Sequence, residues 1–226
     1  MRWLVLAVAL TGCVDDTSPP WQLDHDRIIA VRATPPRIAA GEQAVIDGLI
    51  GFQGAPVAEQ SPVDAEVLSP AGFAPVLHND GARWLVTAPS AEQLAAARAG
   101  LGLADDALVP VQLEVGYAGG LRATKTVWLG GAAANPAMTN VEIDRAAATQ
   151  AALVVAPLRD VPLSIALDDA TYDVTWLSSC GTMHDFDLPS AFLRVEAADP
   201  KTGQLALVVR DSAGGVSWRV WPITAQ

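Results

Sequence analysis

The sequence predicts an all-β protein made of two antiparallel β-sandwiches in tandem, with a short helix inserted in the first. Three observations lead to this prediction. Short runs of valine, isoleucine and leucine are separated by glycine, proline and aspartate throughout residues 27–226. Apolar and polar residues alternate within several runs, as in strands with one buried face. The runs form two series, 27–131 and 140–226, joined by a linker at 132–139 that contains Pro136.

The first series contains six expected strands. The clearest alternation places Val111, Leu113 and Val115 on one face, with Gln112 and Glu114 on the other. Such half-buried strands are typical of an antiparallel sandwich or barrel. The expected strands are Ile28–Ala33, Ala44–Phe52, Val63–Leu68, Arg83–Thr87, Val109–Tyr117 and Arg122–Leu129.

One segment of the first series departs from the strand pattern. Ser90 and Gln93 have the spacing of a capping box, with Ser90 as N-cap, and Leu94 follows at once. Gly100 supplies a C-terminal stop signal. We therefore expect a short helix over about 91–99, on a connection between strands.

The second series contains seven expected strands, an Ig-sized count for about 90 residues. Tyr172, Val174 and Trp176 alternate with Asp173 and Thr175, which places the tryptophan on the inward face. The expected strands are Val141–Ile143, Ala152–Val155, Leu163–Leu167, Tyr172–Leu177, Phe192–Glu196, Leu205–Arg210 and Val216–Ile223.

The two halves end alike, because Val115–Leu121 recurs in outline as Arg210–Val216, at an offset of 95 residues. Paired glycines in both segments supply the positive φ that tight hairpins need. Leu205–Trp218 resembles the closing hairpin of PKD-type and bacterial Ig-like domains, and Ile28–Ala44 is similar to their opening strands. This resemblance implies tandem Ig-like sandwiches, the second PKD-type. It also implies a role as adhesion, spacer or carbohydrate-side module.

The first twelve residues have the form of a secretory leader. Arg2 precedes a short apolar run, Trp3–Leu10, which is too short to span a bilayer. The stretch Leu10-Thr11-Gly12-Cys13 resembles the lipobox of bacterial lipoproteins. The resemblance implies cleavage before Cys13 and acylation of its thiol, so that the membrane is the expected partner. The structural alternative is an ordinary secreted protein with an incidental cysteine at this position.

Residues 13–26 follow as an expected flexible acidic tether. They contain Pro19-Pro20 and four acidic residues and show no periodicity. By resemblance to lipoprotein sorting signals, Val14 after the cysteine indicates the outer rather than the inner membrane. The net charge of −11 argues against nucleic acid as a partner and against electrostatic adhesion to anionic lipid.

Cys180 and His184 are the pair that most resembles a catalytic constellation, with Asp185 or Asp187 able to orient the imidazole. Residues four apart in a glycine-containing loop are poorly placed to meet, so we favour Cys180 as a small buried side chain. Zinc would need further ligands, and His78 and His25 lie far away in sequence.

Calcium is the one cofactor left open, since sandwich domains often bind it between loops. The candidate carboxylate pairs are Asp105-Asp106, Asp168-Asp169 and the Asp185/Asp187 pair, none within an EF-hand-type loop. We favour the interpretation that these aspartates are solvated turn residues. The sequence therefore predicts no catalytic, cofactor-binding or metal residues.

Five tryptophans could fill cores or line a glycan-binding platform: Trp84, Trp128, Trp176, Trp218 and Trp221. Trp218 and Trp221 are three residues apart, so on a regular strand they face opposite sides. We expect one in the core and the other partly exposed.

Serine-hydrolase and nucleotide-binding motifs are absent from the sequence. The leading hypothesis is a non-enzymatic envelope lipoprotein that acts as a binding, adhesion or spacer module for an unidentified protein or glycan. The alternatives are a periplasm-facing accessory subunit of a secretion or cell-wall assembly complex and, less favoured, a lipid-anchored hydrolase.

Overall fold

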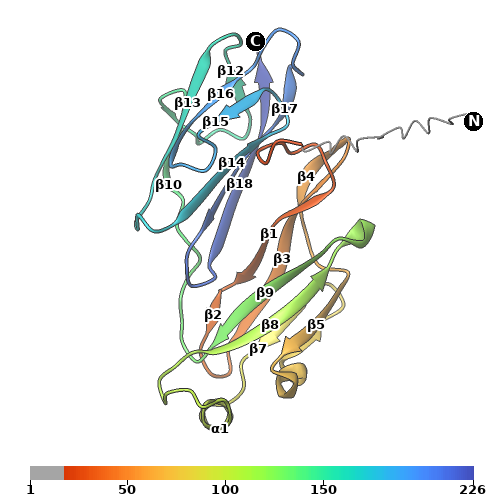
Figure 1. Cartoon of the computed structure of the whole chain (residues 1–226), viewed down its shortest axis with the longest axis vertical. Coiled ribbons are helices and arrows are strands. Elements are labelled where there is room, and N and C mark those ends of the chain that lie inside the picture. The colour runs from red at the N-terminus through yellow and green to blue at the C-terminus, as the bar shows by residue number, and fades with distance from the viewer. Residues whose placement is uncertain (1–17) are drawn as a thin grey trace, which may run out of the picture.

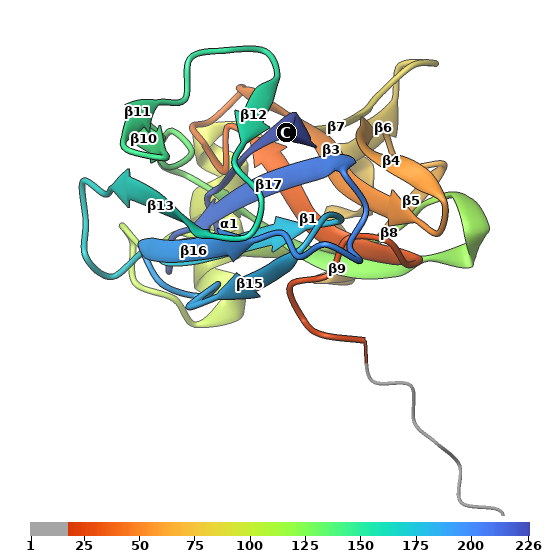
Figure 2. The same ribbon diagram turned by 90° about the horizontal axis from the view of Figure 1, so that it is seen from above.

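The computed structural model describes residues 18–226, which form two β-sandwiches stacked end to end along the long axis (Figure 1). Seen along that axis, the two sandwiches overlie one another (Figure 2). The C-terminus lies at the far end of the second sandwich, and the single α-helix lies at the opposite end of the molecule. Within residues 18–226 no helix is long and apolar enough to cross a membrane.

The first sandwich contains nine strands, one α-helix and two short 3₁₀ segments. These are β1 (Arg27–Thr34), β2 (Arg37–Ile38), β3 (Gln43–Phe52), β4 (Ala55–Gln60), β5 (Asp64–Ser69), η1 (Ala71–Val76), β6 (Leu77–Asn79), β7 (Trp84–Thr87), α1 (Ala91–Leu101), β8 (Val109–Gly116), η2 (Ala118–Gly120) and β9 (Arg122–Leu129).

Its two sheets have the strand orders β1-β3-β7-β6 and β2-β9-β8-β5. All pairings are antiparallel except that of the two-residue β2, which runs parallel to β9. Opening strands split between both sheets and a closing hairpin in the second sheet are features of an Ig-like sandwich. β4 is an addition that pairs with the second half of β3.

The second sandwich contains the remaining nine strands. These are β10 (Thr139–Ile143), β11 (Ala146–Ala147), β12 (Leu153–Val155), β13 (Asp160–Ala166), β14 (Asp173–Ser178), β15 (Thr182–His184), β16 (Ser190–Arg194), β17 (Thr202–Arg210) and β18 (Val216–Ala225).

Its sheets, β10-β13-β16-β15 and β12-β18-β17-β14, repeat the order of the first sandwich, with β11 added beside β10. The two glycine turns that recur in the sequence join equivalent closing strands, β8 to β9 and β17 to β18. The predicted fold, two tandem Ig-like sandwiches with one inserted helix, is therefore confirmed.

The predicted helix is present, and its capping box forms as expected. Ser90 Oγ accepts a hydrogen bond from Gln93 N at 3.3 Å, and Gln93 Oε1 accepts one from Ser90 N at 3.0 Å. The expected end at Gly100 is wrong, because the helix continues to Leu101. Gly102, with a φ of +66°, makes the left-handed cap that Gly100 was expected to make.

Five strands were not predicted, and most are too short to show a period. β2 and β11 have two residues each, and β6 and β15 have three. β4 is longer but contains Pro56, which is tolerated because β4 is an edge strand. A strand pattern needs about four residues before alternation can be seen.

Each sandwich has its own core, and a third apolar cluster joins them. Two central strands are buried on both faces for this reason. On β17, Leu205, Leu207 and Val209 point into the second core, while Ala206 and Val208 belong to the third cluster. On β3, Ile50 points into the first core and Leu49 into the third cluster.

We call this third cluster and the polar contacts around it the domain junction. It consists of Leu23, Ile29, Ala30, Leu49, Val57, Leu177, Ala206, Val208 and Val216, with Trp218 and Val220 partly buried beside them. A fully buried leucine, isoleucine or valine side chain contributes about 1.5–3 kcal/mol. Several such side chains hold the two sandwiches in one orientation.

The described part of the expected tether is not free. Gln22 forms a parallel bridge with Ser178 of β14, and Leu23 N donates to Ser178 O at 3.1 Å. Leu23 is 1% exposed and belongs to the junction. Residues 20–23 therefore lie against the second sandwich before the chain enters β1, which differs from the exposed linker expected over 13–26. Cys13 and the leader lie outside the described residues.

Candidate functional site

An apolar groove lies at the end of the first sandwich farthest from the junction. It has a volume of about 600 Å³ and lies between η1 and α1. We call it the η1–α1 groove. Its lining residues are Pro70, Gly72, Phe73, Pro75, Val76, Thr87, Ala88, Pro89, Gln93, Ala97, Gly100 and Leu101.

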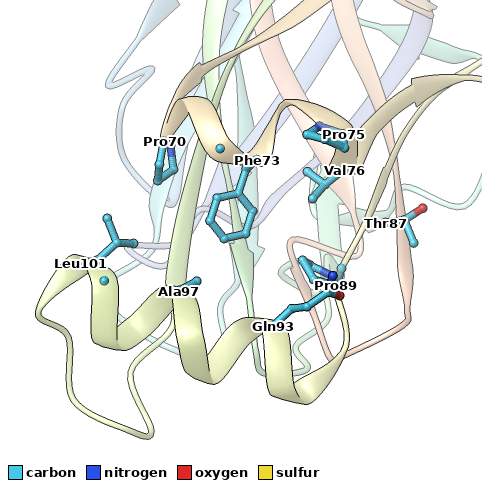
Figure 3. A pocket seen from close by; sticks show the side chains of 12 residues that line it. Pro70, Phe73, Pro75, Val76, Thr87, Pro89, Gln93, Ala97 and Leu101 are labelled. Carbon is cyan, nitrogen blue, oxygen red and sulfur yellow. The ribbon is translucent and has the colours of Figure 1, made fainter.

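Phe73 projects from η1 toward the helix and forms the centre of the groove (Figure 3). Ala97 and Gln93 lie on the side of α1 that faces Phe73, and Leu101 lies at the C-terminal end of the helix. Phe73 is partly buried against the first core, whereas Leu101 is 43% exposed. The floor is thus part of the core, while one rim is a large apolar side chain in contact with water.

The local sequence explains why this end stays open. α1 is rich in alanine and buries a single side chain, Leu94, so it covers little of the surface below it. Pro75 and Pro70 keep the chain of η1 from continuing as a strand. None of the residues that line the groove is charged, although the whole chain has 25 acidic residues.

The sequence-predicted Cys180 and His184 are not brought together as a reactive pair. Cys180 is fully buried in the second core, and its Sγ donates to Pro200 O at 2.7 Å. Burial raises the pKa of the Cys180 thiol, and nearby Asp199 raises it further. His184 is exposed on β15. A buried thiol with a raised pKa is a poor nucleophile, so the interpretation of Cys180 as a core side chain is confirmed.

The carboxylate pairs do not converge on a cation site. Asp169 accepts hydrogen bonds from the backbone and hydroxyl of Thr171, both at 2.8 Å, and so stabilises a turn. Asp185 has a φ of +53°, as expected of a turn residue. Across residues 18–226, no three histidine, cysteine or acidic side chains lie close enough to hold a metal.

The tryptophans follow the predicted pattern at the end of the chain. Trp176 and Trp221 are buried in the second core, at 0% and 1% exposure. Trp218 lies at the junction and is partly exposed. This confirms that Trp218 and Trp221 face opposite sides of β18.

A polar network surrounds Trp218 at the junction. The Arg32 guanidinium stacks over the Trp218 ring at 3.8 Å, and Trp218 Nε1 donates to Glu59 Oε2 at 3.1 Å. Arg32 also pairs with Asp47 and Glu59 at 2.8 and 3.0 Å. Burial raises the pKa of Asp47, and Glu59 adds to the rise although Arg32 opposes it. Residues of both sandwiches thus take part in one network.

A second groove, of about 450 Å³, opens beside the junction between β1 and β9. We call it the junction groove. Its lining includes Arg122 and Lys125 from β9 and Arg210 from β17. It differs from the η1–α1 groove in chemistry, because three of its lining side chains are basic.

No protein-family model matches the sequence, and no curated protein matches it. Among solved structures, the tandem Ig repeats of Dlar have 12% identity and a TM-score of 0.33, over 89% of this chain and 98% of that one.

Two further solved structures are also weakly similar to this chain. The human mucin-like protocadherin EC1-2 has 14% identity and a TM-score of 0.27, over 87% of this chain and 97% of that one. A nucleoside hydrolase-related hypothetical protein from Saccharophagus degradans has 16% identity and a TM-score of 0.31. It is matched over 42% of this chain, which spans only 26% of that protein. With TM-scores this low, no conclusion about function follows from any of them.

Sequence reasoning missed both grooves, although one signal was present. Lys125 lies on the inward register of β9, two residues before buried Val127 and four before buried Leu129. A lysine at such a position marks an unusual environment. Phe73 and Leu101 gave no comparable signal, because neither belongs to an alternating segment.

Proposed function

We propose that this chain is a lipid-anchored, non-enzymatic binding protein of the bacterial cell envelope. In this proposal Cys13 carries the lipid, and the η1–α1 groove binds an apolar segment of a partner protein. The observation that carries the binding role is the groove itself, an uncharged apolar surface of about 600 Å³ on a strongly acidic chain. Uncovered apolar surface of this kind is typical of interaction sites.

The shape and polarity of the groove favour a protein segment over a small polar ligand. Small-molecule sites combine apolar walls with a few convergent polar groups. Here the polar side chains are Thr87 and Gln93, and the oxygen of each already accepts a hydrogen bond. Thr87 Oγ1 accepts from Gln43 at 3.0 Å, and Gln93 Oε1 accepts in the capping box. Apolar side chains of a partner can fill the space around Phe73 without leaving polar groups unpaired.

The lipobox Leu10-Thr11-Gly12-Cys13 supports the membrane anchor, and Val14 favours the outer membrane. The first described residues lie at the junction, whereas the η1–α1 groove lies at one end of the molecule. The fixed junction would then hold the groove away from the point where the chain leaves for the membrane. A binding site held at a distance from its anchor suits a partner that is itself outside that membrane.

Site-specific photo-crosslinking in intact cells of the source bacterium tests the binding role. A photoreactive residue at Ala97, inside the groove, is compared with one at Ala96, which is exposed on the same helix outside it. We expect a discrete adduct from position 97 that is absent from position 96. Leu101→Glu should abolish it while the protein stays folded. Equal adducts at both positions, or none at position 97, would contradict a partner in this groove.

A further inference from the structure

The junction groove brings together basic side chains from both sandwiches. Lys125 belongs to β9 of the first sandwich and Arg210 to β17 of the second, and both line the groove. The remaining walls are residues 28–31 of β1, Leu121 just before β9, and residues 122–124 of β9. Arg210 is the only lining residue from the second sandwich, so the two cations face one groove only because the two sandwiches are joined.

Neither Lys125 nor Arg210 has a carboxylate in contact. Among the ion pairs of residues 18–226, none includes either residue. Lys125 Nζ donates to Gly214 O at 2.6 Å, which uses one of its three protons. Arg210 donates to Thr175 Oγ1 at 3.2 Å and to Ile29 O at 2.8 Å. All of these acceptors are neutral oxygens.

This arrangement leaves positive charge poorly compensated at a partly dehydrated site. Lys125 is 7% exposed, and burial lowers its pKa to about 8. Arg210 acts on Lys125 in the same direction, while Asp211 and Asp47 oppose the change without touching the ammonium group. Burial also lowers the pKa of Arg210, although Asp173, its cross-strand neighbour on β14, opposes the change without forming an ion pair with it. Burial lowers the pKa of Arg27 as well, and Arg210 adds to that shift. A dehydrated cation without an ion partner is costly unless an anion accompanies it.

The third basic residue of the groove is already neutralised. Arg122 pairs with Glu114 at 2.6 Å and with Asp64 at 3.0 Å. It therefore adds little attraction for a further negative charge. Lys125 and Arg210 remain as the two groups with free charge facing the groove.

We propose that the junction groove is a binding site for an oxyanion, a phosphate or carboxylate group held between Lys125 and Arg210. An ammonium group and a planar guanidinium group are the side chains that bind such anions, with charge-assisted hydrogen bonds. Because one cation comes from each sandwich, the bound anion bridges the two. This site is separate from the η1–α1 groove and does not depend on its function.

Isothermal titration of the mature, detergent-solubilised protein at constant ionic strength tests the site. Inorganic phosphate and acetate are titrated separately, to tell a phosphate site from a carboxylate site, with chloride as the control anion. We expect saturable binding of phosphate or acetate near one per chain. Lys125→Met and Arg210→Gln should each weaken it at least tenfold. Arg83→Gln, which removes an exposed arginine paired with Asp80, is the matched control.

Proton uptake provides a second readout. A bound anion raises the pKa of Lys125, so binding at pH 8 should take up about half a proton in wild type and none in Lys125→Met. The groups that face Lys125 are Asp47 on β3, Asp211 in the β17–β18 turn and Arg210 on β17. If Arg210→Gln fails to fold, Arg210→Lys should retain binding.

Three results would overturn the site. The first is a lack of saturable binding by either anion. The second is wild-type affinity in folded Lys125→Met. The third is an equal loss in Arg83→Gln, which would show general attraction to basic residues.

Discussion

The side chain of Gln204 pairs with the backbone of Val57 as a neighbouring strand would. Gln204 Oε1 accepts from Val57 N at 2.6 Å, and Gln204 Nε2 donates to Val57 O at 3.2 Å. One residue of the second sandwich thus satisfies both polar groups of a residue on edge strand β4. The hydrophobic junction is thereby extended by a directional polar contact.

Replacing Gln204 with methionine should destabilise the junction by about 1–3 kcal/mol, because it leaves two partly buried backbone groups of Val57 without partners. Denaturant unfolding followed by tryptophan fluorescence measures this loss. Gln43→Met is the control, since Gln43 makes an exposed hydrogen bond to Thr87. A loss no larger than that of the control would show that the Gln204 contact contributes nothing.

A charge placed in the junction should separate the two sandwiches without unfolding them. Leu49 is 1% exposed on the outer face of β3, so Leu49→Asp would leave a carboxylate among apolar side chains. We expect a larger radius of gyration in small-angle scattering and two unfolding transitions in place of one. Val45→Asp, on the same face of β3 but outside the junction, should change neither. A single transition and an unchanged radius of gyration in Leu49→Asp would show that burial of Leu49 is not what holds the sandwiches together.

Burial of Lys125 predicts a pH-dependent stability. The pKa of Lys125 is lowered from 10.5 to about 8 in the folded protein, so the folded state loses its proton first as pH rises. The contribution of this group to stability is therefore fully present above pH 10.5 and is lost as pH falls through 8. It amounts to at most about 3 kcal/mol.

The measurement is the difference in free energy of unfolding between wild type and Lys125→Met from pH 7 to 10.5. The difference should shift in favour of wild type as pH rises through this range. Lys201→Met, which removes the exposed lysine at the start of β17, is the control. A difference that stays constant with pH would show that Lys125 is not dehydrated in the folded state.

How much of the molecule could be predicted depended on how regular each segment is. The long alternating strands, the capping box at Ser90 and the inward Trp176 follow from period and residue type, and all are present. The junction could not be predicted, because a run such as Leu205–Val209 indicates a strand but not what covers its second face. Leu23 was hidden for a similar reason, since its burial depends on β14, some 150 residues away.

The two candidate grooves were harder to predict from the sequence than the strands. The η1–α1 groove is formed by a connection without period and by a helix without a clear apolar face. The groove exists because η1 and α1 leave part of the apolar surface beneath them uncovered. The junction groove combines Lys125 with Arg210 across two domains, and no local pattern relates them. By contrast, the chemistry of Cys180 was readable, because a lone cysteine after a core tryptophan is most often a core residue itself.

The thiol of Cys180 should be protected in the folded protein. Burial and a raised pKa both reduce the fraction of reactive thiolate. With Cys13→Ser, we expect modification by a thiol-specific disulfide reagent to be at least about a hundredfold slower than in urea, since it requires local opening. Ser190→Cys in a Cys180→Ser background gives the rate of an exposed thiol. A native rate close to that reference would show that the second core is open around Cys180.

The proposed lipid anchor at Cys13 predicts that loss of this cysteine releases the protein from the membrane. Cys13→Ser should move the chain from the membrane to the soluble fraction and abolish incorporation of labelled fatty acid. Protease treatment of intact cells then reports which side the protein faces. Cleavage while a periplasmic marker survives indicates the cell surface, and cleavage only after the outer membrane is opened indicates that the protein faces the periplasm. Fractionation unchanged by Cys13→Ser would disprove the anchor.

Because β17 is buried on both faces, the junction cannot form until this strand has been synthesised. The N-terminal sandwich is synthesised first, with Leu49, Ile29 and Val57 forming an apolar face on its surface. The residues that cover this face, from Leu177 to Val220, are made later. Until then the nascent protein exposes an apolar surface that can aggregate. We therefore expect a chaperone that covers this face, or rapid synthesis of Leu177–Val220, to raise the yield of folded protein. Truncations before β17 should accumulate as aggregates.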